Sequence, residues 1–144
     1  QKWCARSMGV LIDTCVWVSV ATARVTPEDI ERVTRAEPVF ISPVTLAELR
    51  YGAELAADPS IRMQRLAALE RLRRRPLLTI GAATADVFGL IAAQLRQSGK
   101  IRQRVQDLWL ASQAIEHGFA LATENIRDFA DIPGLRVLAV AKKG

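Results

Sequence analysis

The stretch Gly9-Val10-Leu11-Ile12-Asp13-Thr14 decides the fold class. Its apolar run, residues 9–12, shows no alternation of polar and apolar side chains, which is typical of a strand buried on both faces of a parallel sheet. Asp13 and Thr14 follow, at the point where such a strand meets a loop or a helix. Because ligands of open α/β sheets bind beyond the carboxyl ends of the strands, the residues that follow each strand are the first candidates for a functional site.

Short apolar runs and longer helical patterns alternate along the rest of the chain. Helix starts are marked by Thr26-Pro27, by Ser42-Pro43 and by Thr45 with Glu48, which fits a capping box. The pattern predicts further strands at 39–41, 77–80, 119–123 and 135–140, helices at 26–36, 42–58, 59–75, 82–97 and 105–117, and a helical turn at 125–131. This alternation favours a parallel α/β sheet with helices on both faces.

The composition is that of one globular domain. The 144 residues are 50% hydrophobic and 24% charged, which excludes a disordered or low-complexity chain. We assign residues 1–7 to an N-terminal extension and residues 8–144 to a single domain, because Met8 directly precedes the first strand. No apolar run approaches the roughly 20 residues of a membrane-spanning helix, and no signal-peptide pattern is present. We therefore expect a cytoplasmic protein with reduced thiols.

Charge, histidine and tryptophan content narrow the function classes. The formal net charge is +5, so nucleic acid is a candidate partner, beside the alternative of a mildly basic soluble surface. His117 is the one histidine, which excludes a ribonuclease with paired histidines and most zinc sites. It precedes Gly118 at a predicted helix end, where a cation favours the helix dipole. Trp17 and Trp109 could stack on bases, but packing in the core or an interface is the favoured interpretation.

Four acidic residues fall near the ends of predicted strands or in the first turns of the helices that follow. They are Asp13, Glu48, Asp107 and Asp128, with Asn125 three residues before the last. If the strands are parallel neighbours, these side chains converge on one edge of the sheet, where a hard divalent cation with oxygen ligands would relieve their repulsion. Each acid also has a local alternative. These are a helix cap for Asp13, a capping-box partner for Glu48, a dipole-favoured charge for Asp107 and a polar turn for Asp128.

Five short sequence motifs, taken in their order along the chain, resemble those of a known protein family. They are 10–14 (VLIDT), 42–49 (SPVTLAEL), 107–112 (DLWLAS), 121–129 (LATENIRDF) and 132–135 (IPGL). In order and spacing, from about residue 9 to residue 140, the chain resembles the PIN-domain ribonucleases of the VapC type, the toxins of bacterial VapBC toxin–antitoxin modules. The resemblance implies a PIN-like α/β fold, with a short central parallel sheet of about five strands flanked by helices.

The resemblance also implies a metal site. Asp13, Glu48 and Asp107 match the three acids that hold Mg²⁺ or Mn²⁺ in this family. The fourth position varies within the family, so that either Asn125 or Asp128 matches it. We therefore assign Asp128 as a candidate catalytic and metal-binding residue, and Asn125 as a candidate neutral oxygen donor or substrate contact.

Neighbouring residues are assigned in the same way. Thr14 and Thr123 resemble hydroxyl residues that line the site. The residue before the third acid is commonly Asn in the family and is Gln106 here, which weakens any inference about an amide at that place. The basic loop before the third acid contains Arg102 and Arg104, which we expect to contact RNA phosphates.

The residue types fit the activity that the resemblance implies. Mg²⁺ ions on carboxylates can hydrolyse a phosphodiester bond without histidine. The implied protein is a metal-dependent endoribonuclease toxin that cuts tRNA or ribosomal RNA, has a VapB-type antitoxin as its partner and forms a homodimer. The alternative is a catalytically inactive PIN-like RNA-binding module. A haloacid-dehalogenase phosphatase is disfavoured because it requires a second Asp two residues after the first, where Cys15 stands.

Overall fold

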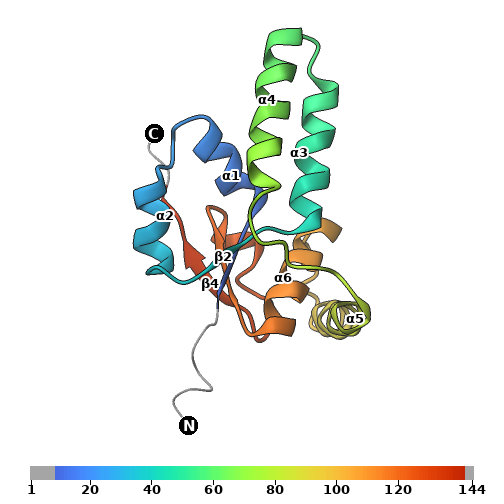
Figure 1. Cartoon of the computed structure of the whole chain (residues 1–144). Helices are drawn as coiled ribbons and strands as arrows, with labels where there is room; N and C mark the ends of the chain where they lie inside the picture. Colours follow the sequence, from blue (N-terminus) through green and yellow to red (C-terminus); the bar gives the residue numbers. More distant parts are fainter. Residues whose placement is uncertain (1–8, 142–144) are drawn as a thin grey trace.

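The central sheet of the described residues contains four parallel strands in the order β2-β1-β3-β4. The computed structural model describes residues 9–141, so the predicted extension at 1–7 lies outside the described residues. The strands are β1 (Val10–Ile12), β2 (Val39–Phe40), β3 (Ala120–Thr123) and β4 (Arg136–Ala139). β1 and β3 are far apart in the sequence but adjacent in the sheet (Figure 1). The residues that follow these two strands therefore meet at one edge.

The predicted strand at 77–80 is reduced to one bridge beside β2. Ile41 pairs with Leu77 in parallel, and the Leu78 amide donates to the Ile41 carbonyl at 2.9 Å. Leu78 is buried in the core, whereas Leu77 and Ile80 are exposed, so only one large apolar side chain of the segment is fully packed against the protein. The α/β architecture is confirmed, with four strands and this bridge where about five strands are predicted.

The helices lie close to the positions that the sequence predicts. They are α1 (Thr14–Ala21), α2 (Pro27–Thr34), α3 (Pro43–Leu55), α4 (Pro59–Leu72), α5 (Ala82–Gln97), α6 (Val105–His117) and the 3₁₀ turn η2 (Ile126–Asp128). The bounds of α5 and α6 are those predicted, whereas α2, α3 and α4 end before the predicted positions. The segment after Asp13, which the sequence leaves as a loop or a helix, is helical.

Polar side chains and a glycine set the helix ends. Thr26 and Asp29 form a capping box at α2, in which each side chain accepts from the backbone amide of the other. Ser42 caps α3 by accepting from the Val44 amide at 3.0 Å. The predicted capping box of Thr45 and Glu48 is therefore wrong, since both residues lie inside α3. Gly118 ends α6 in the left-handed region, with φ of 70°, as its position predicts.

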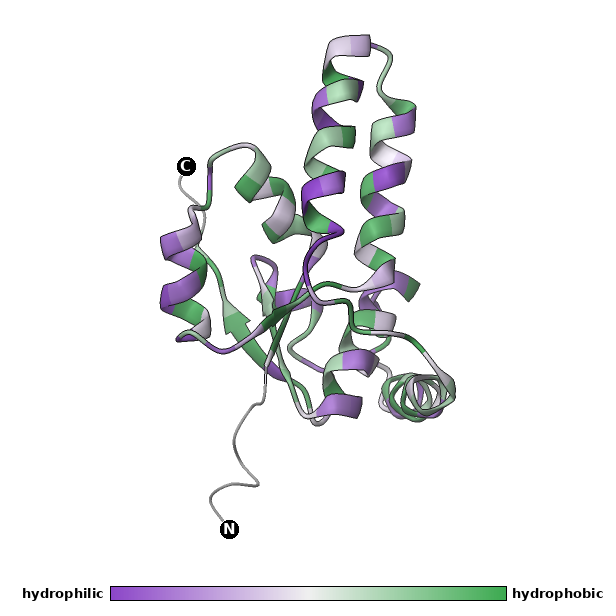
Figure 2. Ribbon diagram, viewed as in Figure 1, coloured by the Kyte–Doolittle hydropathy of each residue, from purple (hydrophilic) through white to green (hydrophobic). Residues whose placement is uncertain are grey.

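The two faces of the sheet carry separate hydrophobic clusters, because successive residues of a strand point to opposite faces. Leu11 and Leu121 pack with residues of α5 and α6 on one face. Val10, Ile12 and Ala122 pack with residues of α1 on the other. Figure 1 shows α5 and α6 on one side of the sheet and α1 and α2 on the other, and Figure 2 shows the hydrophobic colouring of the central strands.

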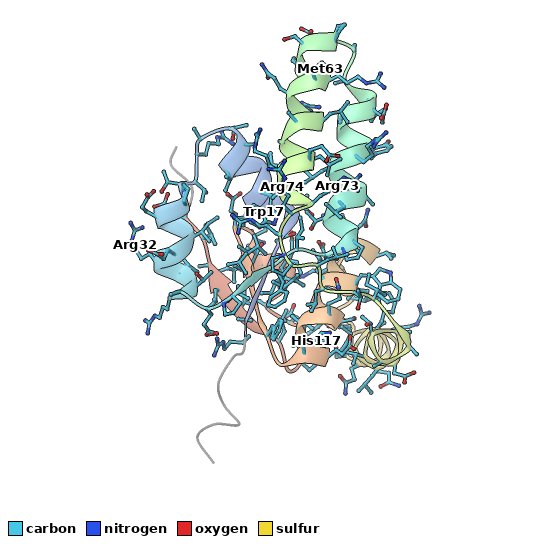
Figure 3. All side chains as sticks on the ribbon, in the orientation of Figure 1. Trp17, Arg32, Met63, Arg73, Arg74 and His117 are labelled. Atoms are coloured by element: carbon cyan, nitrogen blue, oxygen red, sulfur yellow. The ribbon has the colours of Figure 1, made fainter. Side chains whose placement is uncertain are left out.

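Helices α3 and α4 form an antiparallel hairpin that extends away from the sheet (Figure 1). Large apolar side chains are exposed along it, among them Tyr51, Leu55 and Met63, which is labelled near the hairpin tip in Figure 3. Among the described residues, no helix combines the length and the apolar character needed to span a bilayer.

Candidate metal centre

Asp13 lies at the carboxyl end of β1, where it also begins α1. The pairing of Ile12 with Ala122 places it beside Thr123, the last residue of β3. Thr123 Oγ1 donates to Asp13 Oδ2 at 2.8 Å, and the Thr14 amide donates to Oδ1 at 2.7 Å. The helix cap considered from the sequence is thus real, but the capping carboxylate also faces a neighbouring strand.

Burial shapes the acid chemistry of this carboxyl group. Asp13 is only 5% exposed. Burial raises its pKa above the ordinary value, and the charge of Asp107 acts in the same direction, against hydrogen bonds from Thr123, Cys15 and the Thr14 amide. A carboxylate in this setting is stabilised by any cation that reaches it.

Cys15 is a half-buried neighbour of Asp13, and sequence reasoning gives it no role in the site. Its Sγ donates to Asp13 Oδ2 at 3.2 Å. Burial, together with the charge of Asp13, raises the pKa of the Cys15 thiol to about 12. The thiol is therefore protonated at neutral pH, so it serves as a hydrogen-bond donor and not as a thiolate ligand or nucleophile.

Glu48 reaches the same edge of the sheet from α3. Thr14 Oγ1 donates to Glu48 Oε1 at 2.8 Å and lies 2.9 Å from Thr45 Oγ1. A hydroxyl group has one proton to donate, so Thr45 is the donor in the second bond. Thr45 is fully buried, and it positions Glu48 through Thr14. Sequence reasoning missed this role, although Thr45 and Glu48 are three residues apart and therefore share one face of α3.

Asp107 approaches from the first turn of α6. Its side chain is 4% exposed, and Oδ2 accepts from the Arg104 amide at 3.3 Å, which caps the helix. The Arg104 guanidinium lies 3.2 Å from Asp107 Oδ1 and 3.8 Å from Glu48 Oε2. Three elements, β1, α3 and α6, thus bring Asp13, Glu48 and Asp107 to one edge of the sheet, and Arg104 is the cation beside them.

Asn125 and Asp128 follow β3, at the start and at the end of the η2 turn. Both are exposed and line a cavity of about 540 Å³, together with Arg102, Glu124, Ile126 and Arg127. Within residues 9–141, no hydrogen bond or ion pair joins Asp128 to Asp13, Glu48 or Asp107. Asn125 is linked to the cluster through its backbone, since its amide donates to Thr123 Oγ1 at 2.9 Å.

The oxygen-rich donor set suits Mg²⁺ or Mn²⁺, because both ions prefer carboxylates. In the described part of the chain, no three His, Cys, Asp or Glu side chains are placed so that they could hold one ion without moving. In this arrangement the Arg104 guanidinium contacts two of the three acids. The residue types therefore fit the cation, and side-chain rotation at this edge is required to close the ligand set.

The two tryptophans and the histidine considered in the sequence analysis lie in packing or helix-end positions. Trp17 is buried under the Arg75 guanidinium, 4.9 Å from the ring centre, and Trp109 packs against Phe88 at 4.3 Å. Both tryptophans therefore pack against the protein itself, as the sequence analysis predicts. His117 occupies the last turn of α6, at the opposite end of this helix from Asp107 (Figure 3).

Comparison with known proteins identifies the family. A family model described as the PIN domain matches residues 10–135, a range that contains all four predicted acids. The chain belongs to the PIN-domain family. "Ribonuclease VapC4" of Mycobacterium tuberculosis is 30% identical to it over 130 residues, covering 90% of this chain and 95% of the relative. "Ribonuclease VapC1" of Rickettsia felis is 30% identical over 137 residues, covering 94% and 99%.

Solved structures agree with this placement. The DNA-bound VapBC of Salmonella typhimurium superposes with a TM-score of 0.79 at 28% identity, covering 93% of this chain and 99% of that chain. VapBC-5 of Mycobacterium tuberculosis, described as a member of the VapBC family of toxin–antitoxin systems, superposes with a TM-score of 0.76 at 29% identity, covering 92% and 99%. The predicted resemblance to VapC-type PIN domains and the predicted PIN-like fold are confirmed.

Proposed function

We propose that this protein is a divalent-metal-dependent endoribonuclease that acts as the toxin of a toxin–antitoxin module. The observation that carries the proposal is the convergence of Asp13, Glu48 and Asp107 at one edge of the sheet in a PIN-domain chain. The relatives named as VapC ribonucleases support the reaction, and the similarity to them extends over nearly the whole chain.

In this proposal, Asp13, Glu48 and Asp107 hold Mg²⁺ or Mn²⁺, and Asp128 or Asn125 completes the site. The bound ion supplies charge neutralisation at the phosphate and a water of lowered pKa. The protein's own contribution is positioning: Thr123 and the Thr14 amide orient the Asp13 carboxylate, and the Thr14 hydroxyl orients Glu48. Such outer hydrogen bonds hold ligands in a productive rotamer.

The substrate proposed is RNA, of the tRNA or ribosomal class. Arg102 and Arg127 line the same cavity as Asn125 and Asp128, and the whole chain carries a formal net charge of +5, which favours a polyanion. Arg102 also pairs with Asp131 at 2.9 Å, so its guanidinium is held at the rim of this cavity. One relative, from Salmonella typhimurium, is named as a tRNA(fMet)-specific endonuclease.

The proposed partners are a VapB-type antitoxin and a second copy of the toxin, in the cytoplasm. The support for the antitoxin is the similarity to toxin chains of VapBC complexes. The α3–α4 hairpin adds a physical reason, because its exposed Tyr51, Leu55 and Met63 are apolar surface that a partner could cover.

The test is cleavage of total RNA by antitoxin-free protein with Mg²⁺ or Mn²⁺. We expect discrete cuts that are abolished by EDTA. In Asp13→Asn the cleavage rate should fall by more than about a hundredfold, because Asp13 is a proposed metal ligand and even the loss of a residue that only supports a ligand costs roughly 10- to 100-fold. The matched control is Asp58→Asn. Asp58 caps α4 on the hairpin through the Ser60 amide, and Asn caps equally well, so cleavage should be unchanged.

Two results would count against the nuclease. Cutting that survives both EDTA and Asp13→Asn would show that another activity is responsible. Intact RNA in every pool, together with binding of that RNA by the protein, would favour the catalytically inactive RNA-binding module.

A further inference from the structure

Arg104 engages two acids of the cluster at once. Its Nη2 lies 3.2 Å from Asp107 Oδ1, its Nε lies 3.5 Å from Asp107 Oδ2, and its Nη1 lies 3.8 Å from Glu48 Oε2. Asp107 belongs to α6 and Glu48 to α3. One guanidinium therefore joins two helices through the carboxylates that the proposed function assigns to a metal ion.

The charges of the acids, and not burial, hold this side chain in place. The Arg104 side chain is 63% exposed, whereas those of Asp107 and Glu48 are 4% and 23% exposed. The hydrogen bond to Asp107 raises the pKa of Arg104, and the charges of Asp107, Glu48 and Asp13 add to this rise against partial desolvation. A long side chain with an exposed head can leave the cluster without opening the core.

We propose that Arg104 is an internal competitor of the metal ion, which neutralises Glu48 and Asp107 in the metal-free protein and is released to contact RNA phosphate when a divalent cation binds. The inference rests on the proposed metal site and adds a positioning residue to it. Its physical basis is competition, because the guanidinium already contacts two of the carboxylates that would hold the cation. Release leaves a planar cation beside the site, and guanidinium geometry suits phosphate.

The first test is Mn²⁺ binding to the RNA-free protein, measured by titration calorimetry and by the electron paramagnetic resonance signal of free Mn²⁺. Arg104→Gln keeps the backbone amide that caps α6 but removes the competing charge. We expect this variant to bind Mn²⁺ roughly five- to tenfold more tightly than the wild type, the range set by hydrogen bonds to charged groups and by half-exposed ion pairs.

The matched control is Arg102→Gln, which removes the same charge from the same loop. Arg102 pairs with Asp131, outside the three-acid cluster. We expect its Mn²⁺ affinity to stay within about twofold of the wild type, since exposed charges that are not in contact interact weakly. Equal tightening in both variants would overturn the competitor role, because the loop's charge alone would then explain the effect.

Other outcomes separate this inference from the proposed function. Equal Mn²⁺ affinity in the wild type and Arg104→Gln overturns the competition and leaves the metal site standing. No Mn²⁺ binding in either protein overturns both. The release step is tested by anisotropy of a labelled single-stranded RNA, in EDTA and in Ca²⁺, with gels confirming that the RNA stays intact. Arg104→Gln should weaken RNA binding about two- to fivefold in Ca²⁺ only; equal weakening in EDTA overturns the release.

Discussion

Asp13 and Asp128 are predicted for the same site, yet they lie in opposite surroundings. Asp13 is 5% exposed and accepts hydrogen bonds from Thr123, Cys15 and the Thr14 amide. Asp128 is exposed on η2 and lines a cavity with two arginines. The difference teaches that the Asp13 carboxylate is oriented by hydrogen bonds of the fold before any ligand arrives, whereas the Asp128 carboxylate faces solvent.

The largest effect within this comparison is expected at Thr123. Thr123→Val removes the hydroxyl that joins Asp13 to the Asn125 amide while keeping the side-chain shape. We expect RNA cleavage to fall roughly 10- to 100-fold, as for outer-shell partners of metal ligands. Thr123→Ser restores the hydroxyl and should recover most of the activity. Loss in the Ser variant as great as in the Val variant would mean that packing at the end of β3, and not the hydrogen bond, is what matters.

A smaller effect is expected on the exposed side. Asp128→Asn should lower cleavage by roughly tenfold or less, because the carboxylate is open to water and lies in a cavity with Arg102 and Arg127, where screening weakens its charge. Asn125→Ala is the companion variant, and it should cost less than Asp128→Asn if Asp128 completes the site. Cleavage rates measured over a Mg²⁺ titration check both. A loss in Asp128→Asn as large as in Asp13→Asn would erase the contrast between the two sides.

The smallest effect is on stability and follows from the raised pKa of Asp13. The folded protein binds this proton more tightly than the unfolded chain does, so the free energy of unfolding falls as the pH rises from the ordinary Asp value of 3.8 through the raised pKa. The contribution of Asp13 to the free energy of unfolding is fully present below pH 3.8 and is lost as the pH passes the raised pKa. Urea unfolding in EDTA should show the wild type losing stability relative to Asp13→Asn across this window and no further change above it. A stability difference that does not depend on pH would contradict the raised pKa.

Local sequence signals predict most of the fold and part of the site. The apolar runs at β1 and β3 and the periodic patterns of α5 and α6 match the structure, because burial and helix propensity act over a few neighbouring residues. The segment 77–80 has the same apolar composition as a strand, but it makes only one bridge. Its pairing depends on what lies beside it in space, and composition does not carry that information.

The same division holds inside the candidate site. The sequence by itself determined which acids follow strands or begin helices, and the order of the motifs determined the family. Only the tertiary structure decided that Thr45 is a donor to Thr14 and not a helix cap, that Asp128 is exposed whereas Asp13 is buried, and that Arg104 joins Glu48 to Asp107. The physical reason is that strand and helix signals act between near neighbours in the chain, whereas these contacts bring together residues that only the packing of helices around the parallel sheet makes adjacent.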